Sequence, residues 1–362
     1  MHPSVEMNQQ ERRLPLLQAK HLRKTFIRQS SSFEHRWSNW TVSGEGNLES
    51  KSNKTVVEAV NDVSITVNFQ EIVGLVGESG SGKTTLARLL LRLIPLDRDQ
   101  KVLRPEIWFD GEEITHLPRR QMRERRTKIR MMFQHPESVL NPFLRIRELL
   151  TESIEIHDDT LDKGQKVSLE SLLRSVNLPN VLEQYAGDLS GGQLRRVSIL
   201  RTLIGNPKLI VADEPVASLD FSVQTQIIEL IRQISEQREI AFLLISHNLP
   251  MILSLSDRMM VMYKGSIVET GQKREMQASV YHPYTIGLWQ SANYDLHRQS
   301  KVPLSWKRPA EGSCVYLPNC RLYELLKSSD QEQCEHEVPV LQQISTNRHV
   351  ACHHYQQAVE IN

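Results

Sequence analysis

A glycine-rich octapeptide stands between an apolar run and a leucine-rich segment, and this order of elements constrains the fold more than any other feature of the chain. Residues 72–76 read Ile-Val-Gly-Leu-Val, residues 77–84 read Gly-Glu-Ser-Gly-Ser-Gly-Lys-Thr, and residues 85–91 read Thr-Leu-Ala-Arg-Leu-Leu-Leu. The apolar run predicts a buried strand, and the last segment predicts a helix. A glycine-rich turn between them points backbone amides inward at a helix N-terminus, which is an arrangement that binds a polyphosphate.

This loop predicts a site for a nucleoside triphosphate and Mg²⁺. Lys83 would neutralise the β- and γ-phosphate oxygens, and the hydroxyl of Thr84 would be one ligand of a magnesium ion that keeps most of its waters. The alternative is a strand-to-helix turn without a ligand, which the complete order of strand, loop and helix disfavours. The predicted nucleotide-binding segment consists of Gly77, Glu78, Ser79, Gly80, Ser81, Gly82, Lys83, Thr84 and Thr85.

Length and charge limit the classes of protein that remain. The 362 residues predict about two domains, and the 44 basic and 43 acidic residues nearly cancel, so no overall field gathers nucleic acid or an anionic membrane. The basic run at residues 117–130 is interpreted as a solvated helix face rather than a nucleic-acid contact, because it has no interleaved aromatic residues. No stretch approaches the roughly 20 apolar residues of a membrane span, and the N-terminus has no signal-peptide core. We therefore expect the chain in the cytosol.

Alternating strand and helix patterns predict an α/β fold with a mainly parallel sheet. The strands are expected at residues 16–28, 60–67, 72–76, 209–212 and 241–245, and the helices at residues 85–91, 167–176, 193–204 and 224–234. Residues 30–54 are rich in Ser, Asn, Gly and charge, and they predict an exposed insertion. After about residue 269 the periodicity weakens and prolines recur, so a second, loop-rich unit is expected there.

Two adjacent acids follow the predicted strand at residues 209–212. A carboxylate at this position beside the phosphate loop would hold Mg²⁺ through water, and the next acid would lie near the attacking water. We therefore assign Asp213 to the metal and Glu214 as the general base. Paired acids after a strand can also be only a turn or a helix N-cap, but the phosphate loop upstream favours the catalytic interpretation.

A second loop of small residues opens the helix predicted at residues 193–204. Residues 189–193 read Leu-Ser-Gly-Gly-Gln, and the amides of Ser190, Gly191, Gly192 and Gln193 would form a second cradle for an anion. The alternative is a plain helix N-terminus with Ser190 as its cap. One chain would thus have two phosphate-binding loops.

The order of these motifs resembles that of the nucleotide-binding subunit of an ABC transporter. It runs from the phosphate loop through Gln134, the Leu-Ser-Gly-Gly-Gln segment, Asp213 and Glu214, and Ser218-Leu219-Asp220 to His247, and it covers residues 16–270. The resemblance implies a P-loop NTPase cassette with a mainly parallel sheet, an antiparallel β subdomain and a helical subdomain at about residues 135–205. It also implies ATP as the nucleotide and a head-to-tail dimer in which Ser190 and Gly192 act across the interface.

The same resemblance implies roles for four further residues. Gln134 matches the glutamine that contacts magnesium and the attacking water, and His247 matches the histidine that touches the γ-phosphate. Asp220 matches an acid that contacts the partner. Phe26 is the candidate to stack on adenine, although a buried strand Phe is the competing interpretation.

Three local features resemble the ATPases of peptide importers of the oligopeptide, dipeptide and antimicrobial-peptide type. They are residues 133–142, with His135 where Asp is common, residues 212–220, and His-Pro-Tyr-Thr at residues 282–285, which begins a C-terminal extension at residues 271–362. The expected function is therefore an ATP-hydrolysing subunit that powers peptide transport. The alternatives are an ABC ATPase for another small solute such as nickel, and a soluble ABC ATPase that acts on nucleic acid or the ribosome.

All four cysteines, Cys314, Cys320, Cys334 and Cys352, lie in this extension. A reducing compartment disfavours disulfides, and four thiolates suit a [4Fe–4S] cluster or tetrahedral zinc. The resemblance favours the cluster, although the gap between Cys320 and Cys334 is longer than the family's spacing. Four unrelated thiols without a metal, or His353 or His354 as a replacement ligand, are the other interpretations. A further interpretation is that the C-terminal unit is a redox sensor that governs the ATPase.

The resemblance finally implies partners and a location. The partners are a second ATPase subunit, in a homodimer or a heterodimer, two integral membrane permease subunits near Gln134, and indirectly a solute-binding protein. The expected location is the cytoplasmic face of the inner or plasma membrane, as a peripheral protein.

Overall fold

The structure is a computed structural model that describes residues 14–29, 54–97, 103–135, 140–155, 169–178, 180–292, 310 and 312–360. Apart from Lys54, the predicted insertion at residues 30–54 lies outside the described residues. The same holds for residues 136–139, which follow Gln134, and for the first two residues of the helix predicted at 167–176.

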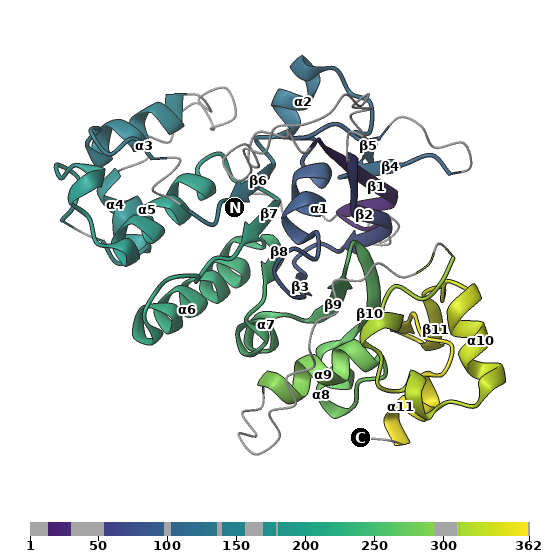
Figure 1. The fold of residues 1–362 in the computed structure, drawn as a ribbon. Helices are drawn as coiled ribbons and strands as arrows, with labels where there is room; N and C mark the ends of the chain where they lie inside the picture. Colours follow the sequence, from purple (N-terminus) through teal and green to yellow (C-terminus); the bar gives the residue numbers. More distant parts are fainter. Residues whose placement is uncertain are drawn as a thin grey trace, which may run out of the picture.

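Eight strands of the described residues form the central sheet, in the order β11-β12-β10-β9-β3-β8-β7-β6 (Figure 1). The five neighbouring strands from β9 to β6 run parallel, whereas β10, β12 and β11 continue the sheet in antiparallel fashion. The bounds are β3 (Ile72–Val76), β6 (Ile129–Met132), β7 (Leu209–Asp213), β8 (Ala241–Ser246), β9 (Arg258–Tyr263), β10 (Ser266–Gln272), β11 (Gln342–Ser345) and β12 (Arg348–Val350). The predicted α/β fold with a mainly parallel core is confirmed.

The central strands are buried on both faces, which explains their continuous apolar sequences. Because successive side chains point to opposite faces, Ile210 and Ala212 of β7 join one apolar cluster while Leu209 and Val211 join the other. On the first face the sheet packs against α6 (Phe221–Arg238) and α7 (Leu249–Leu255). On the second face it packs against α1 (Lys83–Leu90).

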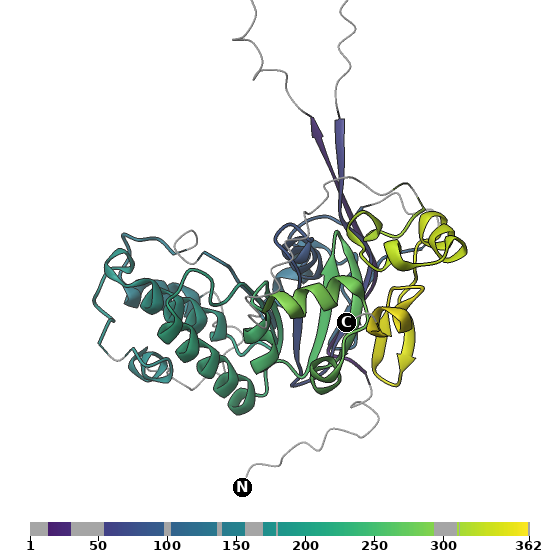
Figure 2. The same ribbon diagram turned by 60° about the horizontal axis from the view of Figure 1, so that its bottom comes forward.

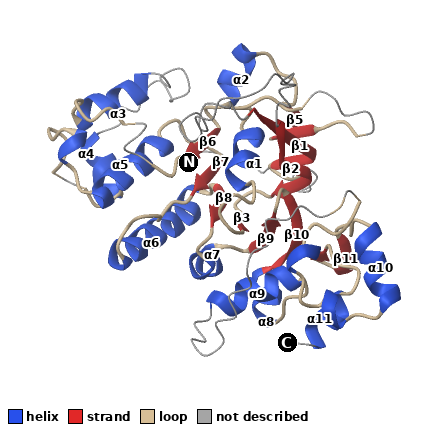
Figure 3. Cartoon of the chain, in the orientation of Figure 1, coloured by secondary structure: helices blue, strands red, loops and turns tan. Residues whose placement is uncertain are grey.

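A smaller antiparallel sheet lies on the other side of α1, with the strand order β2-β1-β4-β5. One apolar cluster joins α1 to both sheets, so α1 is the layer between them (Figure 3). The bounds are β1 (Leu17–Gln29), β2 (Lys54–Val67), β4 (Glu106–Phe109) and β5 (Glu112–Glu113). This sheet is the expected antiparallel β subdomain.

Three helices gather beside the edge strand β6, away from the small sheet (Figure 1). They are α3 (Ile146–Glu155), α4 (Leu169–Ser175) and α5 (Gly191–Leu203), and they correspond to the expected helical subdomain. The basic run at residues 117–130 forms α2 (Arg119–Arg125) and the start of β6. Met122 is the buried residue of α2, as expected of a solvated helix face. For the rest of the run the expectation is wrong, because Arg126, Lys128 and Arg130 lie beyond the helix, are half-buried and donate to backbone carbonyls.

The C-terminal segment completes the central sheet. Its strand β12 pairs with β10, with Glu269 opposite Val350, and β11 pairs with β12. The helices of this part are α8 (Lys273–Ala278), α9 (Pro283–Ala292), α10 (Ser328–His336) and α11 (Tyr355–Glu360), and Figure 2 shows the segment beside β10. None of the helices in the described part of the chain is long and apolar enough to span a membrane.

Candidate active site

The phosphate loop connects β3 to α1 and lies tightly against β2 and β9. A Cβ atom at Gly77 would be 2.2 Å from the carbonyl oxygen of Met262, and one at Gly82 would be 2.0 Å from that of Ala59. Gly82 also has a φ of +105°, in the left-handed region that favours glycine. The two glycines are therefore required by the fold itself, before any ligand is considered.

Lys83, the first residue of α1, turns back over this loop. Its Nζ donates to the carbonyl oxygens of Gly77, at 2.7 Å, and Glu78, at 2.8 Å, and to Oγ of Ser81, at 3.3 Å. Burial lowers the pKa of Lys83, and the nearby carboxylates of Glu214 and Asp213 oppose that effect. The structure thus brings the predicted phosphate-binding lysine and the two predicted acids together.

Asp213 ends β7 and is only 3% exposed. Burial raises its pKa, Glu214 raises it further, and a hydrogen bond from Thr84 and the charge of Lys83 oppose the shift. Among the described residues, Asp213 Oδ1 is buried without a hydrogen-bond partner. An unpartnered carboxylate oxygen beside the hydroxyl of Thr84 fits a hard divalent cation. Thr85 follows in the same helical turn and is half-buried.

Glu214 is held by the end of the neighbouring strand β8. Oγ of Ser246 donates to its Oε2 at 2.7 Å, the backbone amide of His247 donates to its Oε1 at 3.0 Å, and Nδ1 of His247 lies 2.7 Å from the same Oε1. Glu214 has a φ of 49°, uncommon for a side chain of this kind, and is 8% exposed. These contacts fix the carboxylate in one orientation, which suits a group that must align a water molecule. The imidazole of His247 is 60% exposed.

The structure separates the two interpretations of Phe26. The ring lies on β1 and is 44% exposed, with Nζ of Lys24 at 5.6 Å from its centre. The competing interpretation of a buried strand Phe is therefore wrong. Gln134 follows β6 and is half-buried, and its backbone carbonyl accepts a hydrogen bond from Arg195 of α5.

Ser190 is the N-cap of α5. Its Oγ accepts from the amide of Gln193 at 3.3 Å, while Oε1 of Gln193 accepts from the amide of Ser190 at 2.9 Å. This reciprocal pair is a capping box. Ser190 therefore acts as the cap of the helix, which was the alternative interpretation of this residue. Gly191 and Gly192 form the first turn, and a Cβ at Gly192 would be 2.8 Å from Cγ1 of Val223.

Asp220 caps the helix that Val223 belongs to. Its Oδ1 accepts from the amide of Val223 at 3.0 Å and from Oγ of Ser222 at 2.7 Å, and these bonds lower its pKa. Because Gly192 packs on Val223, the Leu-Ser-Gly-Gly-Gln segment and the Asp220 turn form one surface. Phe221, the first residue of α6, is among its most exposed side chains.

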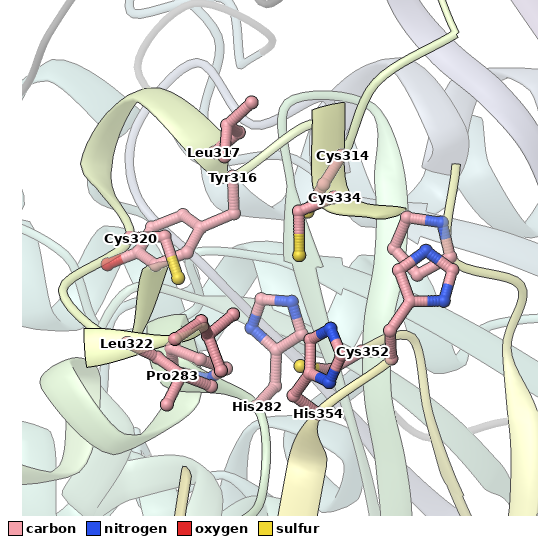
Figure 4. A pocket seen from close by; sticks show the side chains of 13 residues that line it. His282, Pro283, Cys314, Tyr316, Leu317, Cys320, Leu322, Cys334, Cys352 and His354 are labelled. Atoms are coloured by element: carbon pink, nitrogen blue, oxygen red, sulfur yellow. The ribbon is translucent and has the colours of Figure 1, made fainter. Parts of the chain in front are cut away.

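The four cysteines line one pocket in the C-terminal segment (Figure 4). His282, Tyr316, His353 and His354 share its walls. Burial raises the pKa of Cys320 and Cys352 to about 12 and that of Cys334 to about 11, and it also raises the pKa of Cys314. Across the described ranges, no three His, Cys, Asp or Glu side chains lie close enough together to hold a single metal ion as they stand.

Comparison with known proteins identifies the family. The family model described as "ABC transporter" matches residues 60–217. The protein named "Probable peptide ABC transporter ATP-binding protein y4tS" of Sinorhizobium fredii is 37% identical over 311 residues, which are 84% of each chain. The chain belongs to the ATP-binding proteins of ABC transporters. The predicted family and the predicted enzyme class, an ATPase, are therefore confirmed.

Two further relatives match most of this chain in sequence, and a solved cassette matches its fold. The oligopeptide transport ATP-binding protein AppF of Bacillus subtilis is 34% identical over 309 residues, covering 83% of this chain and 90% of its own. The dipeptide transport protein DppF of Lactococcus lactis is 37% identical over 265 residues, covering 72% and 84%. The ADP conformation of MJ1267, an ATP-binding cassette of an ABC transporter, has a TM-score of 0.56 at 24% identity, covering 76% of this chain and 99% of its own. The predicted cassette fold is thus confirmed.

Two residues of this ABC cassette were missed by the sequence reasoning. Ser246 is held next to Glu214, and its signal was present, because it directly follows the strand predicted at residues 241–245 and precedes His247. Tyr284 stands in the His-Pro-Tyr-Thr segment at residues 282–285, but nothing in that local sequence indicates a contact with the phosphate loop. Its hydroxyl accepts a hydrogen bond from the amide of Glu78 in the phosphate loop, 206 residues earlier in the chain.

Proposed function

We propose that this chain hydrolyses ATP at residues 77–85 and thereby powers the transport of peptides through separate membrane subunits. The observation that carries the proposal is the fixed carboxylate of Glu214, held by Ser246 and His247 within electrostatic reach of Lys83. The names of AppF and DppF support peptides as the transported class. Gln134 and His247 are the candidates to contact the attacking water and the γ-phosphate.

The reaction follows from what these side chains can do. Glu214 orients a water molecule toward the γ-phosphorus and accepts its proton, and the bond from the γ-phosphorus to the bridging oxygen breaks so that ADP leaves. Lys83 neutralises charge on the phosphate oxygens during this step. Phe26, exposed at the end of the small sheet, is available to stack on the base. Thr84 and Asp213 would hold Mg²⁺, which supplies further neutralisation of the triphosphate charge.

The substitution Glu214→Gln tests the catalytic assignment. The amide keeps the size of the side chain but accepts no proton, so we expect turnover to fall by about a hundredfold or more while ATP binding stays intact. Glu236→Gln is the matched control, because Glu236 lies exposed on α6. Hydrolysis by purified Glu214→Gln at the rate of the unaltered chain would disprove the role of Glu214.

We also propose that a second ATPase subunit completes the site, head to tail, through Ser190, Gly192 and Asp220. The shared surface of these residues and the exposed Phe221 support the proposal. A solved structure of similar fold is described as "Dimeric structure of a post-hydrolysis state of the ATP-binding cassette MJ0796 bound to ADP and Pi". That dimer also supports the proposed pairing of two ATPase subunits. The two permease subunits would dock near Gln134 and place the chain on the cytoplasmic face of the membrane. Gentle purification with the membrane fraction should retain two integral membrane proteins, and the retention of RNA instead would contradict this assignment.

We propose a [4Fe–4S] cluster at Cys314, Cys320, Cys334 and Cys352. Four thiols on one pocket are the donor set of such a cluster. A cluster of four irons is also wider than one ion, so its ligands stand further apart than those of a single zinc. Anaerobically purified protein should contain iron and acid-labile sulfide, and Cys320→Ser should lose most of both. Stoichiometric zinc without sulfide would refute the cluster.

A further inference from the structure

A hydrogen bond joins the C-terminal segment to the phosphate loop. The amide of Glu78 donates to the hydroxyl of Tyr284 at 2.9 Å. The same peptide unit presents the carbonyl oxygen of Gly77 to Nζ of Lys83 at 2.7 Å. The Gly77–Glu78 peptide is thus held on one side by the predicted phosphate-binding lysine and on the other by Tyr284.

Tyr284 is itself firmly held. It is 3% exposed, and its ring lies 4.6 Å from that of Tyr263 and 5.7 Å from that of Tyr316. The hydroxyl of Tyr263 accepts from Nδ2 of Asn319 at 2.9 Å. Rings packed in this way have little freedom, so the hydroxyl of Tyr284 offers Glu78 an acceptor at a fixed position.

A buried network fixes the backbone on which Tyr284 stands. The carboxylate of Glu269 accepts from the amides of Tyr281, at 2.9 Å, and His282, at 3.0 Å, and from Nη2 of Arg348, at 2.6 Å. Nδ1 of His282 accepts from the amide of Tyr284 at 3.0 Å. The segment at residues 281–284 therefore has both its backbone and its side chains tied down.

We propose that Tyr284 is a positioning residue of the ATP site, whose hydroxyl fixes the Gly77–Glu78 peptide so that ATP meets a preformed phosphate loop. The inference rests on the proposed function in that residues 77–85 bind ATP. Without the hydroxyl, the half-buried amide of Glu78 loses its acceptor, and the loop must be ordered by the nucleotide at a cost in affinity. The C-terminal segment is then part of the nucleotide site. Tyr316, whose ring contacts that of Tyr284, also lines the cysteine pocket.

The test is Tyr284→Phe in the full-length chain, which removes the hydroxyl and keeps the ring. We expect KM for ATP, and the dissociation constant of a non-hydrolysable ATP analogue, to rise about fivefold, as for the loss of one neutral hydrogen bond. We expect kcat to change less than twofold, because the interaction holds the loop equally before and during the reaction. A residue with only a packing role would lower thermal stability without this split between KM and kcat.

The matched control is Tyr281→Phe, the same change three residues earlier. The ring of Tyr281 contacts Tyr355 and Arg348, so its KM for ATP should stay within twofold of the unaltered chain. A change below twofold in Tyr284→Phe, or an equal rise in Tyr281→Phe, overturns the positioning role.

Lys83→Ala separates the two ways in which the idea can fail. If Lys83→Ala loses ATP binding while Tyr284→Phe is unchanged, only the role of Tyr284 is rejected. Full ATP binding by Lys83→Ala rejects the proposed ATP site itself. If Tyr284→Phe does not accumulate as a folded protein, hydrogen exchange of the unaltered chain is measured without nucleotide instead. Protection of the Glu78 amide supports the positioning role of Tyr284, and exchange at the rate of a free peptide overturns it.

Discussion

The buried ion pair between Arg348 and Glu269 allows the sharpest prediction about the stability of this chain. The two side chains are 2% and 0% exposed and lie on the paired strands β12 and β10. We consider the substitution Arg348→Met, which keeps a long apolar side chain and removes the guanidinium group. The carboxylate of Glu269 is then left with the two backbone amides of Tyr281 and His282.

The expected loss can be worked out from these contacts. Removing one partner of a buried pair costs about 3–5 kcal/mol, because the remaining charge is uncompensated. Within the described residues, Nε of Arg348 is buried without a hydrogen-bond partner, so the guanidinium is not fully satisfied in the native state. We therefore expect the lower end of the range, about 3 kcal/mol.

Urea unfolding followed by circular dichroism measures this loss, and a double-mutant cycle identifies its cause. In Glu269→Gln/Arg348→Met, no buried charge remains without a partner, so the double variant should lose at least about 1.5 kcal/mol less than the sum of the two single variants. Lys20→Met is the control. It removes an exposed pair with Glu106 at 3.9 Å, and we expect it to cost less than about 1 kcal/mol.

Two outcomes would refute this reasoning. If Arg348→Met stays within about 1 kcal/mol of the unaltered chain, Glu269 does not depend on the pair. If the two single losses simply add, the two side chains do not interact, whatever their distance. Limited proteolysis supplies a local readout, since the segment after β10 should be cleaved earlier in Arg348→Met than in Lys20→Met.

Two further predictions concern a buried histidine and two glycines. Burial lowers the pKa of His282 to about 3, whereas an unfolded histidine titrates near 6.5, so between these values the unfolded chain binds more protons and stability falls as pH falls. The free energy of unfolding of the unaltered chain, relative to that of His282→Gln, should therefore fall by about 2 kcal/mol from pH 7.5 to pH 5. A difference between the two proteins that stays constant with pH would show that His282 is not held neutral. Gly80 and Gly82 both have positive φ, but a Cβ meets no heavy atom within 4 Å at Gly80 and meets the Ala59 carbonyl at 2.0 Å at Gly82. Without nucleotide, Gly80→Ala should lose about 1–2 kcal/mol and Gly82→Ala clearly more, and equal losses in thermal unfolding would contradict the clash with Ala59.

Local patterns in the sequence predicted most of the fold and the centre of the candidate site. The phosphate loop and the pair Asp213 and Glu214 each follow a short apolar strand, and parallel strands present their carboxyl ends at one edge of a sheet. Because both motifs follow strands of one parallel sheet, Lys83 could be expected at the same edge as the two acids. The exposure of Phe26 was left open, because an aromatic residue on a strand fits either a buried or an open face equally well.

The contacts that could not be predicted join residues far apart in the chain. Glu78 and Tyr284 are 206 residues apart, and Glu269 and Arg348 are 79 apart. The local sequence around Arg348 gives no sign of its burial, since arginine is rarely buried without a partner and the partner is 79 residues away. The weak periodicity after residue 269 hid β11 and β12, which are short and depend on β10 for their pairing.

The position of these distant contacts explains why the C-terminal segment affects the ATP site. The contacts run without interruption from Arg348 to Glu269, to the amide of His282, through its ring to the amide of Tyr284, and from the hydroxyl of Tyr284 to Glu78. Each group in this series is buried or half-buried, and a close-packed interior passes a displacement on to the next contact instead of absorbing it. On its other side the phosphate loop packs closely against the Met262 and Ala59 carbonyls. A shift of the segment at residues 281–284 therefore reaches the Gly77–Glu78 peptide, the part of the loop that the nucleotide must find in place.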